Sequence, residues 1–242
     1  MPSPNLDPLS LTDEYRLARL RITDLVNEAL DHGVEDFGSL AVPACPAWNV
    51  CDLLAHVAGI ATEISRGNPP TSDSDKWVDD IVIARRGLSP AELIDEWSVS
   101  GPRFEAIAAT NKRLAVPLSY DTVVHEHDLR NAIARPGAKD SSGVVAAMHV
   151  GVWLMTNDLN RHQFGSVRFR AGGRDWISGE GDLKLELDLD AAGYRYPIWE
   201  LLRLTGSRRS LKQMRAFNWR GSTDGAFQAF LHMELPQVDI DE

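Results

Sequence analysis

Cysteine is scarce in this chain, which has only Cys45 and Cys51 among its 242 residues. Their C-x5-C spacing is too wide for a zinc knuckle or a thioredoxin-type pair. In a reducing cytosol we do not expect them to form a structural disulfide. We therefore interpret both as small, half-buried residues near a helix start, with a reactive thiol as the alternative.

Long hydrophobic runs are also missing. No apolar stretch approaches the roughly 18 residues that would indicate a membrane-spanning helix. The first four residues, Met-Pro-Ser-Pro, do not begin a positively charged segment followed by an apolar core, so we do not expect a signal peptide. These absences predict a cytoplasmic protein with no membrane partner.

Positive charge is in the minority, since the formal net charge is −10 and the pI is about 5.2. An acidic chain repels phosphate backbones, and we therefore expect no nucleic-acid partner. Arg208 and Arg209 form a short local exception. The sequence also contains no glycine-rich phosphate loop and no G-x-S-x-G elbow, and the second absence argues against a serine hydrolase.

The first two-thirds of the chain have the periodicity of helices. Apolar residues recur at three- and four-residue steps after Thr12 and again after Asn49, and both residues are candidate N-caps. Ser89 to Glu92 form a capping-box sequence, and Gly101-Pro102 predicts a bend or break in the helix that follows. Further helices are predicted at about 77–85, 120–134, 142–159, 197–205 and 209–217.

The pattern changes after Gly165. Residues 166–171 and 183–189 alternate between apolar and polar side chains, as strands do, and glycines at 172–173 and 179–181 indicate turns. We therefore predict an all-α N-terminal domain over residues 1–164 and a small α+β domain over residues 165–242.

One helical segment carries side chains suited to binding a metal ion. Asp121, His125 and Asp128 share a helix face because residues i, i+4 and i+7 fall on the same side. A carboxylate and an imidazole one turn apart can both bind one ion, and Asp128 can orient such a ligand. Glu126 and His127 point elsewhere and are predicted to be exposed.

His56 is the candidate third ligand, because it lies on the apolar face of its predicted helix and should point inward. A buried imidazole needs a polar partner, and a metal ion shared with Asp121 and His125 would provide one. Spacing alone favours the alternative, a hydrogen-bonded core histidine. His149 is a further candidate ligand, for which packing is the favoured interpretation.

Three stretches of the sequence resemble the mycothiol-dependent maleylpyruvate isomerase family. Residues 45–56 (CPAWNVCDLLAH) resemble its GW-T-V-x-D-x-x-x-H segment, and residues 121–129 resemble its E/D-x-x-x-H-x-x-D-L segment. Residues 200–210 (ELLRLTGSRRS) resemble the ELLRLLxGRRS segment of its C-terminal domain. The three occur in the family's order and span most of the chain.

The resemblance implies a DinB-like four-helix bundle followed by a domain related to sterol-carrier folds. It also implies a divalent metal ion, usually zinc, held by His56, Asp121 and His125, with open positions for water or a thiolate. In members that use mycothiol, the metal lowers the pKa of the cofactor's thiol and presents a nucleophilic thiolate.

The chain departs from the family pattern at two places. The isomerase has Glu where this chain has Asp121, which is one methylene shorter. Ser207 interrupts the Gly-Arg-Arg-Ser motif, a departure that weighs against an anion contact there. Arg208 and Arg209 are candidate cofactor-binding residues, with a solvated helix start as the alternative.

Three function hypotheses follow. The first is a metal-dependent isomerase or transferase that uses a thiol cofactor, such as mycothiol, on a small electrophile. The second is a metal-dependent hydrolase that uses metal-bound water. The third is a non-enzymatic protein that binds a metal or a small molecule.

Overall fold

The structure is a computed structural model that describes residues 7–70, 73–230, 233 and 235–242. Contacts between the described residues divide them into two compact units, one within residues 7–137 and the other within residues 138–242. Among the described residues, no helix combines the length and the apolar character needed to cross a membrane.

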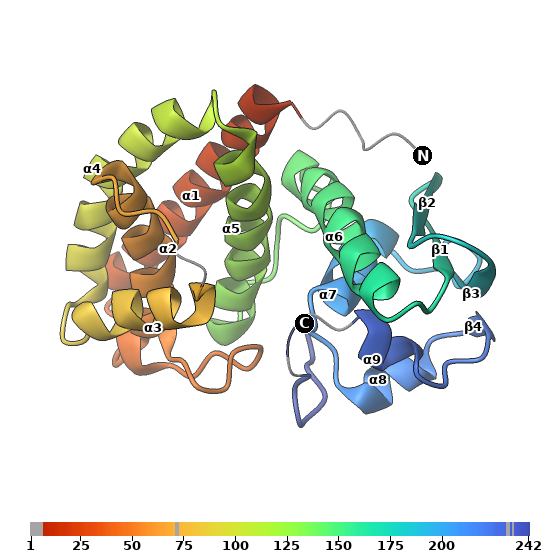
Figure 1. The fold of residues 1–242 in the computed structure, drawn as a ribbon. Helices are drawn as coiled ribbons and strands as arrows, with labels where there is room; N and C mark the ends of the chain where they lie inside the picture. Colours follow the sequence, from red (N-terminus) through yellow and green to blue (C-terminus); the bar gives the residue numbers. More distant parts are fainter. Residues whose placement is uncertain (1–6, 71–72, 231–232, 234) are drawn as a thin grey trace. The chain divides into compact units, whose positions relative to one another are not determined.

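The N-terminal unit consists of helices. The long helices α1, α2, α4 and α5 pack against one another, and α3 packs on α2 (Figure 1). The helical segments are α1 (Pro8–Asp31), the short 3-10 helix η1 (Phe37–Ser39), α2 (Val50–Ser65), α3 (Ser74–Ala84), α4 (Pro90–Ala108) and α5 (Lys112–Ala132). The prediction of an all-α N-terminal part is confirmed, while the DinB-like arrangement stays a prediction.

Two of the predicted helix starts are confirmed by their capping geometry. At α2, the Asp52 amide donates to the Asn49 side chain at 2.9 Å, and the Asn49 amide donates back to the Asp52 carboxylate. Ser89 and Glu92 make the same reciprocal pair at α4. These bonds satisfy amide donors that the first turn of a helix leaves unpaired. At α1 the predicted cap, Thr12, is wrong, because Asp7 caps the helix and Pro8 is its first residue.

The prolines do not break the helices of this unit. Helix α4 continues through Pro102 because both of its halves pack on Tyr15 of α1. The Trp97 indole donates to the Tyr15 hydroxyl at 2.8 Å, and the Phe104 ring lies 4.7 Å from the Tyr15 ring. Helix α5 likewise begins at Lys112, before Pro117, and not after it as predicted. Packing therefore outweighs the single backbone hydrogen bond that each proline removes.

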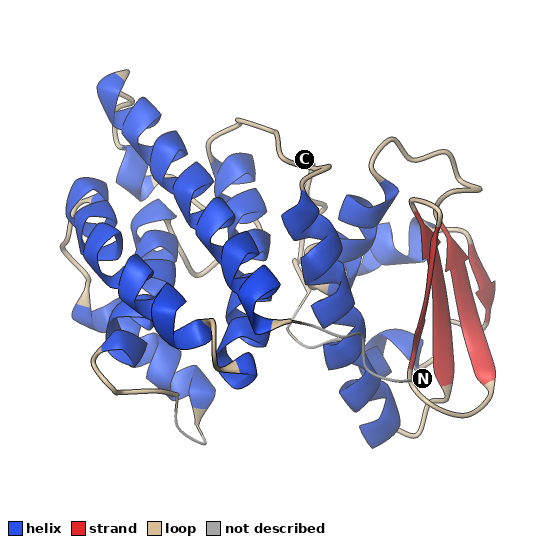
Figure 2. Ribbon diagram, turned by 90° about the horizontal axis from the view of Figure 1, so that it is seen from above, coloured by secondary structure: helices blue, strands red, loops and turns tan. Residues whose placement is uncertain are grey.

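The C-terminal unit is α+β, as predicted. Its strands are β1 (Ser166–Ala171), β2 (Arg174–Ser178), β3 (Leu183–Asp188) and β4 (Trp219–Gly221), and its helices are α6 (Ser142–Arg161), α7 (Pro197–Thr205), α8 (Leu211–Ala216) and α9 (Ala226–Phe230). The strand order is β2-β1-β3-β4, with β1 and β3 parallel and the outer pairs antiparallel. Figure 2 shows the helices of this unit on one side of the sheet.

Alternation along the strands explains how the sheet is covered. Val167, Phe169, Leu185 and Leu187 are buried on the face toward the helices. The residues between them, such as Arg168 and Glu186, are partly exposed and form ion pairs. The period-2 pattern in the sequence therefore identified the central strands, β1 and β3, correctly.

Along the chain, the boundary between the two compact units falls between Gly137 and Ala138, whereas the sequence predicted it after residue 164. Helix α6 packs on α7, α9 and β2, so it belongs to the C-terminal unit. Its periodic apolar face made it resemble another helix of the N-terminal domain. Periodicity shows which face of a helix is buried, but it does not show which neighbour buries it.

Arg85 connects three helices of the N-terminal unit. Its guanidinium lies 2.7 Å from Glu96 on α4 and 3.2 Å from Glu63 on α2, and it donates to the Ile81 carbonyl on α3. A Cβ atom on Gly59 would lie 2.9 Å from Arg85 Cζ, so glycine allows the guanidinium to lie against α2. Burial would raise the pKa of the Glu96 carboxyl, but the Arg85 hydrogen bonds outweigh it and hold that pKa below its usual range.

We predict that Arg85→Met lowers the free energy of unfolding by about 2 kcal/mol, because two partly buried carboxylates lose their cation. Urea denaturation measures the effect. Arg86→Met is the control, because Arg86 is adjacent and exposed. The pKa of Glu96 is lowered in the folded state. The Glu96 carboxylate therefore contributes to the free energy of unfolding above the ordinary carboxyl pKa of about 4.3, and this contribution declines as the pH falls. The difference in unfolding free energy between Arg85→Met and the wild type should become smaller in acid. Equal losses for Arg85→Met and Arg86→Met would show that Arg85 does not stabilise the packing of these helices.

Candidate metal centre

The three predicted ligands converge on one point between α2 and α5. His56 Nε2 lies 3.1 Å from Asp121 Oδ2, and His125 Nε2 lies 3.4 Å from Asp121 Oδ1. One potential ligand atom from each residue lies within 4.8 Å of those of the other two. The spacing on α5 brings Asp121 and His125 together, whereas the packing of α2 on α5 brings in His56.

The site has a buried side and a more open side. The side chains of His56 and His125 are each 6% exposed, whereas the Asp121 side chain is 29% exposed. The half-buried Trp48 covers the two imidazoles, with its ring 5.0 Å from that of His56 and 5.7 Å from that of His125. The carboxylate is therefore the ligand candidate nearest to solvent.

Charge in the site favours a cation. Burial would raise the pKa of Asp121, but the neighbouring positive charge of His56 and His125, with their hydrogen bonds, holds it well below its usual range. Burial would lower the pKa of His125, yet the Asp121 charge and hydrogen bonds to Asp121 and Asp128 raise it well above its usual range. An ionised carboxylate beside two buried imidazoles thus attracts positive charge, whether as protons or as a metal ion.

The donor set fits a divalent metal ion. Two imidazole nitrogens and one carboxylate oxygen are the combination that holds zinc in many catalytic sites, where a further position stays open. All three donors come from long helices, which position side chains more rigidly than loops do. His56, Asp121 and His125 are therefore suited to hold such an ion together.

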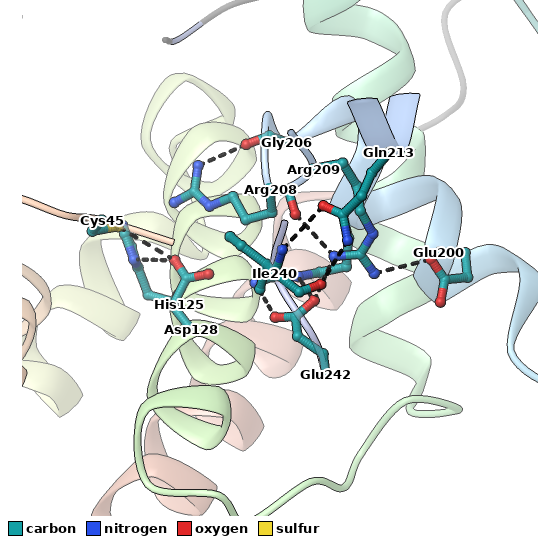
Figure 3. Close-up of polar contacts among 11 residues, drawn as sticks. Cys45, His125, Asp128, Glu200, Gly206, Arg208, Arg209, Gln213, Ile240 and Glu242 are labelled. Carbon is teal, nitrogen blue, oxygen red and sulfur yellow. Dashed lines mark hydrogen bonds and ion pairs between the residues drawn. The ribbon is translucent and has the colours of Figure 1, made fainter. Parts of the chain in front are cut away.

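Asp128 and Cys45 lie on the Nδ1 side of the His125 ring. His125 Nδ1 is 2.9 Å from Asp128 Oδ2, and the Cys45 thiol donates to the same oxygen at 3.7 Å (Figure 3). Asp128 thus lies where the sequence predicted an orienting residue. Cys45 was not predicted to be part of the site, although it stands in the same short motif as His56. Cys45, His125 and Asp128 also form a second group whose ligand atoms lie within 4.8 Å of one another.

Comparison with known proteins gives one family match. Residues 35–130 match the family described as Mycothiol maleylpyruvate isomerase N-terminal domain. The match supports the resemblance to that family for this part of the chain. The match includes the three ligand candidates together with Cys45 and Asp128. No curated protein and no solved structure matches the chain.

Two further residues of the matched segment differ from their prediction. Glu126 and His127 were predicted to be exposed, but both are buried. Helix α1 packs on this face of α5, and Arg21 of α1 binds the Glu126 carboxylate through two hydrogen bonds of 2.8 and 2.6 Å. Arg130, one turn further along α5, donates to the same carboxylate at 3.0 Å. A buried charge is tolerated here because two arginines pair with it.

His149 belongs to the C-terminal unit, outside the family match. The Trp176 indole donates to its Nδ1 atom at 3.1 Å. This contact agrees with the packing interpretation that the sequence favoured for His149.

Arg208 and Arg209 are both buried, so the alternative of a solvated helix start is wrong. Arg208 donates to the Gly206 carbonyl at 2.7 Å, and Arg209 lies 2.7 Å from Glu242 and 2.9 Å from Glu200 (Figure 3). The guanidinium of Arg209 is thus held by carboxylates of its own chain. A cofactor role for Arg208 and Arg209 stays a prediction, and an anion at Arg209 would compete with Glu242.

We predict that Glu242→Gln lowers the free energy of unfolding by about 2 kcal/mol, because its side chain pairs with Arg209 and with the fully buried Arg203. Thermal or urea unfolding measures the loss. Glu180→Gln is the control, since Glu180 is an exposed glutamate of the same unit. A loss no larger than that of the control would show that the ion pairs contribute nothing to stability.

Proposed function

We propose that the chain is a metal-dependent enzyme of the maleylpyruvate isomerase type, which uses a thiol cofactor such as mycothiol on a small electrophile. The observation that supports this most is the convergence of His56, Asp121 and His125 inside a domain of the mycothiol maleylpyruvate isomerase family. In this proposal the three residues hold one divalent ion, and the donor set favours zinc.

Each residue has a role in this proposal. His56 and His125 bind from the buried side, where Trp48 shields their rings from water. Asp121 binds from the more exposed side, next to which a thiol or substrate can approach. Three protein ligands leave a coordination position for that thiol. When bound, the metal ion lowers the pKa of the thiol and so supplies a thiolate nucleophile at neutral pH.

The shorter acidic ligand is compatible with this role. Asp121 has one methylene less than the glutamate of the isomerase, but its carboxylate lies within 3.1–3.4 Å of both imidazoles. It therefore already lies among the donor atoms. This geometry favours direct binding of the metal by Asp121 over binding through water.

The metal assignment predicts that His56→Ala and His125→Ala each lose the ion. Protein purified without added metal should contain about one zinc ion per chain in the wild type and far less in either variant, because two remaining protein ligands bind zinc weakly. Elemental analysis measures this. His162→Ala is the control, since His162 is exposed in the C-terminal unit. Full zinc content in both site variants would mean that the ion is bound elsewhere.

The thiol assignment predicts that mycothiol binds the metal directly. Titration of the cobalt-substituted protein with mycothiol should produce a thiolate-to-cobalt charge-transfer band, which oxygen ligands do not give. An unchanged spectrum at millimolar thiol would favour the hydrolase that uses metal-bound water. Purification without any metal, together with failure to take up zinc or cobalt, would favour the non-enzymatic alternative.

A further inference from the structure

The His125 ring is approached by a carboxylate at each of its nitrogens. Asp121 lies on the Nε2 side and Asp128 on the Nδ1 side, at 3.4 and 2.9 Å. Asp128 is completely buried, and its Oδ2 atom faces both His125 Nδ1 and the thiol of Cys45. The Cys45 thiol is therefore connected to the His125 ring through the Asp128 carboxylate.

The orientation of this ring decides whether it can bind a metal ion. An imidazole that binds a metal ion through one nitrogen keeps a single N–H on the other, and the negative charge of Asp128, 2.9 Å from Nδ1, favours that proton on Nδ1. Nε2 is then left with the lone pair toward Asp121 and His56. Second-sphere carboxylates of this kind commonly raise metal affinity by 10- to 100-fold.

Cys45 belongs to the turn that also carries Trp48. The Trp48 amide donates to the Cys45 carbonyl at 2.8 Å, and the Val42 amide donates to the Trp48 carbonyl at 3.1 Å. This turn is further fixed by the pairing of Ala41 with Asn49, the cap of α2. The Cys45 thiol links this turn to Asp128 on α5.

We propose that Cys45 is a positioning residue of the metal centre. Its thiol ties the turn of residues 41–49 to Asp128, which in turn holds His125 with Nε2 toward the metal, while Trp48 of the same turn covers both imidazoles. This inference rests on the proposed function, because it requires a metal ion at His56, Asp121 and His125. Cys45 itself does not touch the ion.

The test compares Cys45→Ala, Cys45→Ser and Cys51→Ala. Each protein is titrated with cobalt and zinc against a chelator of known affinity, and the visible spectrum of the cobalt form is recorded. We expect Cys45→Ala to weaken metal binding about 10-fold and to change the cobalt spectrum, because Asp128 and His125 lose their fixed orientation. Cys45→Ser should restore both, since a hydroxyl also donates to a carboxylate. Cys51→Ala is the matched control, because Cys51 is also half-buried and belongs to neither group of potential metal-binding residues.

A second pair of variants tests the route through Asp128. Asp128→Asn should weaken metal binding at least as much as Cys45→Ala does. Adding Cys45→Ala to Asp128→Asn should then have no further effect, because residues that act through one contact are not additive. Circular dichroism and the melting temperature of each metal-free variant separate a loss of fold from a loss of affinity.

Three results would overturn the inference. If Cys45→Ala keeps the metal affinity and the cobalt spectrum of the wild type, the Cys45 thiol does not position Asp128 or His125. A thiolate-to-cobalt band in the wild type that disappears in Cys45→Ala, or a fall from two bound ions to one, would make Cys45 a ligand. Absence of metal binding by the wild-type chain would remove the proposed function as well. In the first two cases the proposed function stands.

Discussion

The N-terminal unit depends on one carboxylate placed between two imidazoles. Asp121 joins His56 on α2 to His125 on α5, at the point where these helices pack together. Polar groups at such a depth are stable only when each finds a partner, so the position of one restricts the positions of the others. Trp48 on one side and Asp128 on the other extend this constraint to the neighbouring turn and to the helix itself.

The same principle governs the charges elsewhere in the chain. Arg85 connects α2, α3 and α4 through carboxylates and a carbonyl, and Glu126 binds arginines from α1 and α5. In the C-terminal unit, Arg203 and Arg209 share the side chain of Glu242. A buried ion pair adds little net stability, but loss of one partner is costly, so each cluster favours one arrangement of its helices.

Local signals in the sequence were reliable where the local geometry itself decides the outcome. Capping residues at Asn49 and Ser89 and the alternation in β1 and β3 gave correct elements. The strands β2 and β4 were missed because they have only five and three residues, too few for an alternating pattern to stand out. The break predicted at Pro102 was wrong for a different reason. Contacts of Tyr15 with both halves of α4 outweigh the tendency of proline to end a helix.

The sequence by itself determined that Asp121, His125 and Asp128 share one helix face, because helical spacing alone fixes that relation. Only the tertiary structure decided that His56 faces them, that Cys45 reaches Asp128, and that Arg209 is paired with Glu242. It also decided that Glu126 is buried and that α6 packs with the C-terminal unit. These contacts join residues far apart in the chain, and they follow from how whole helices pack, which no local pattern specifies.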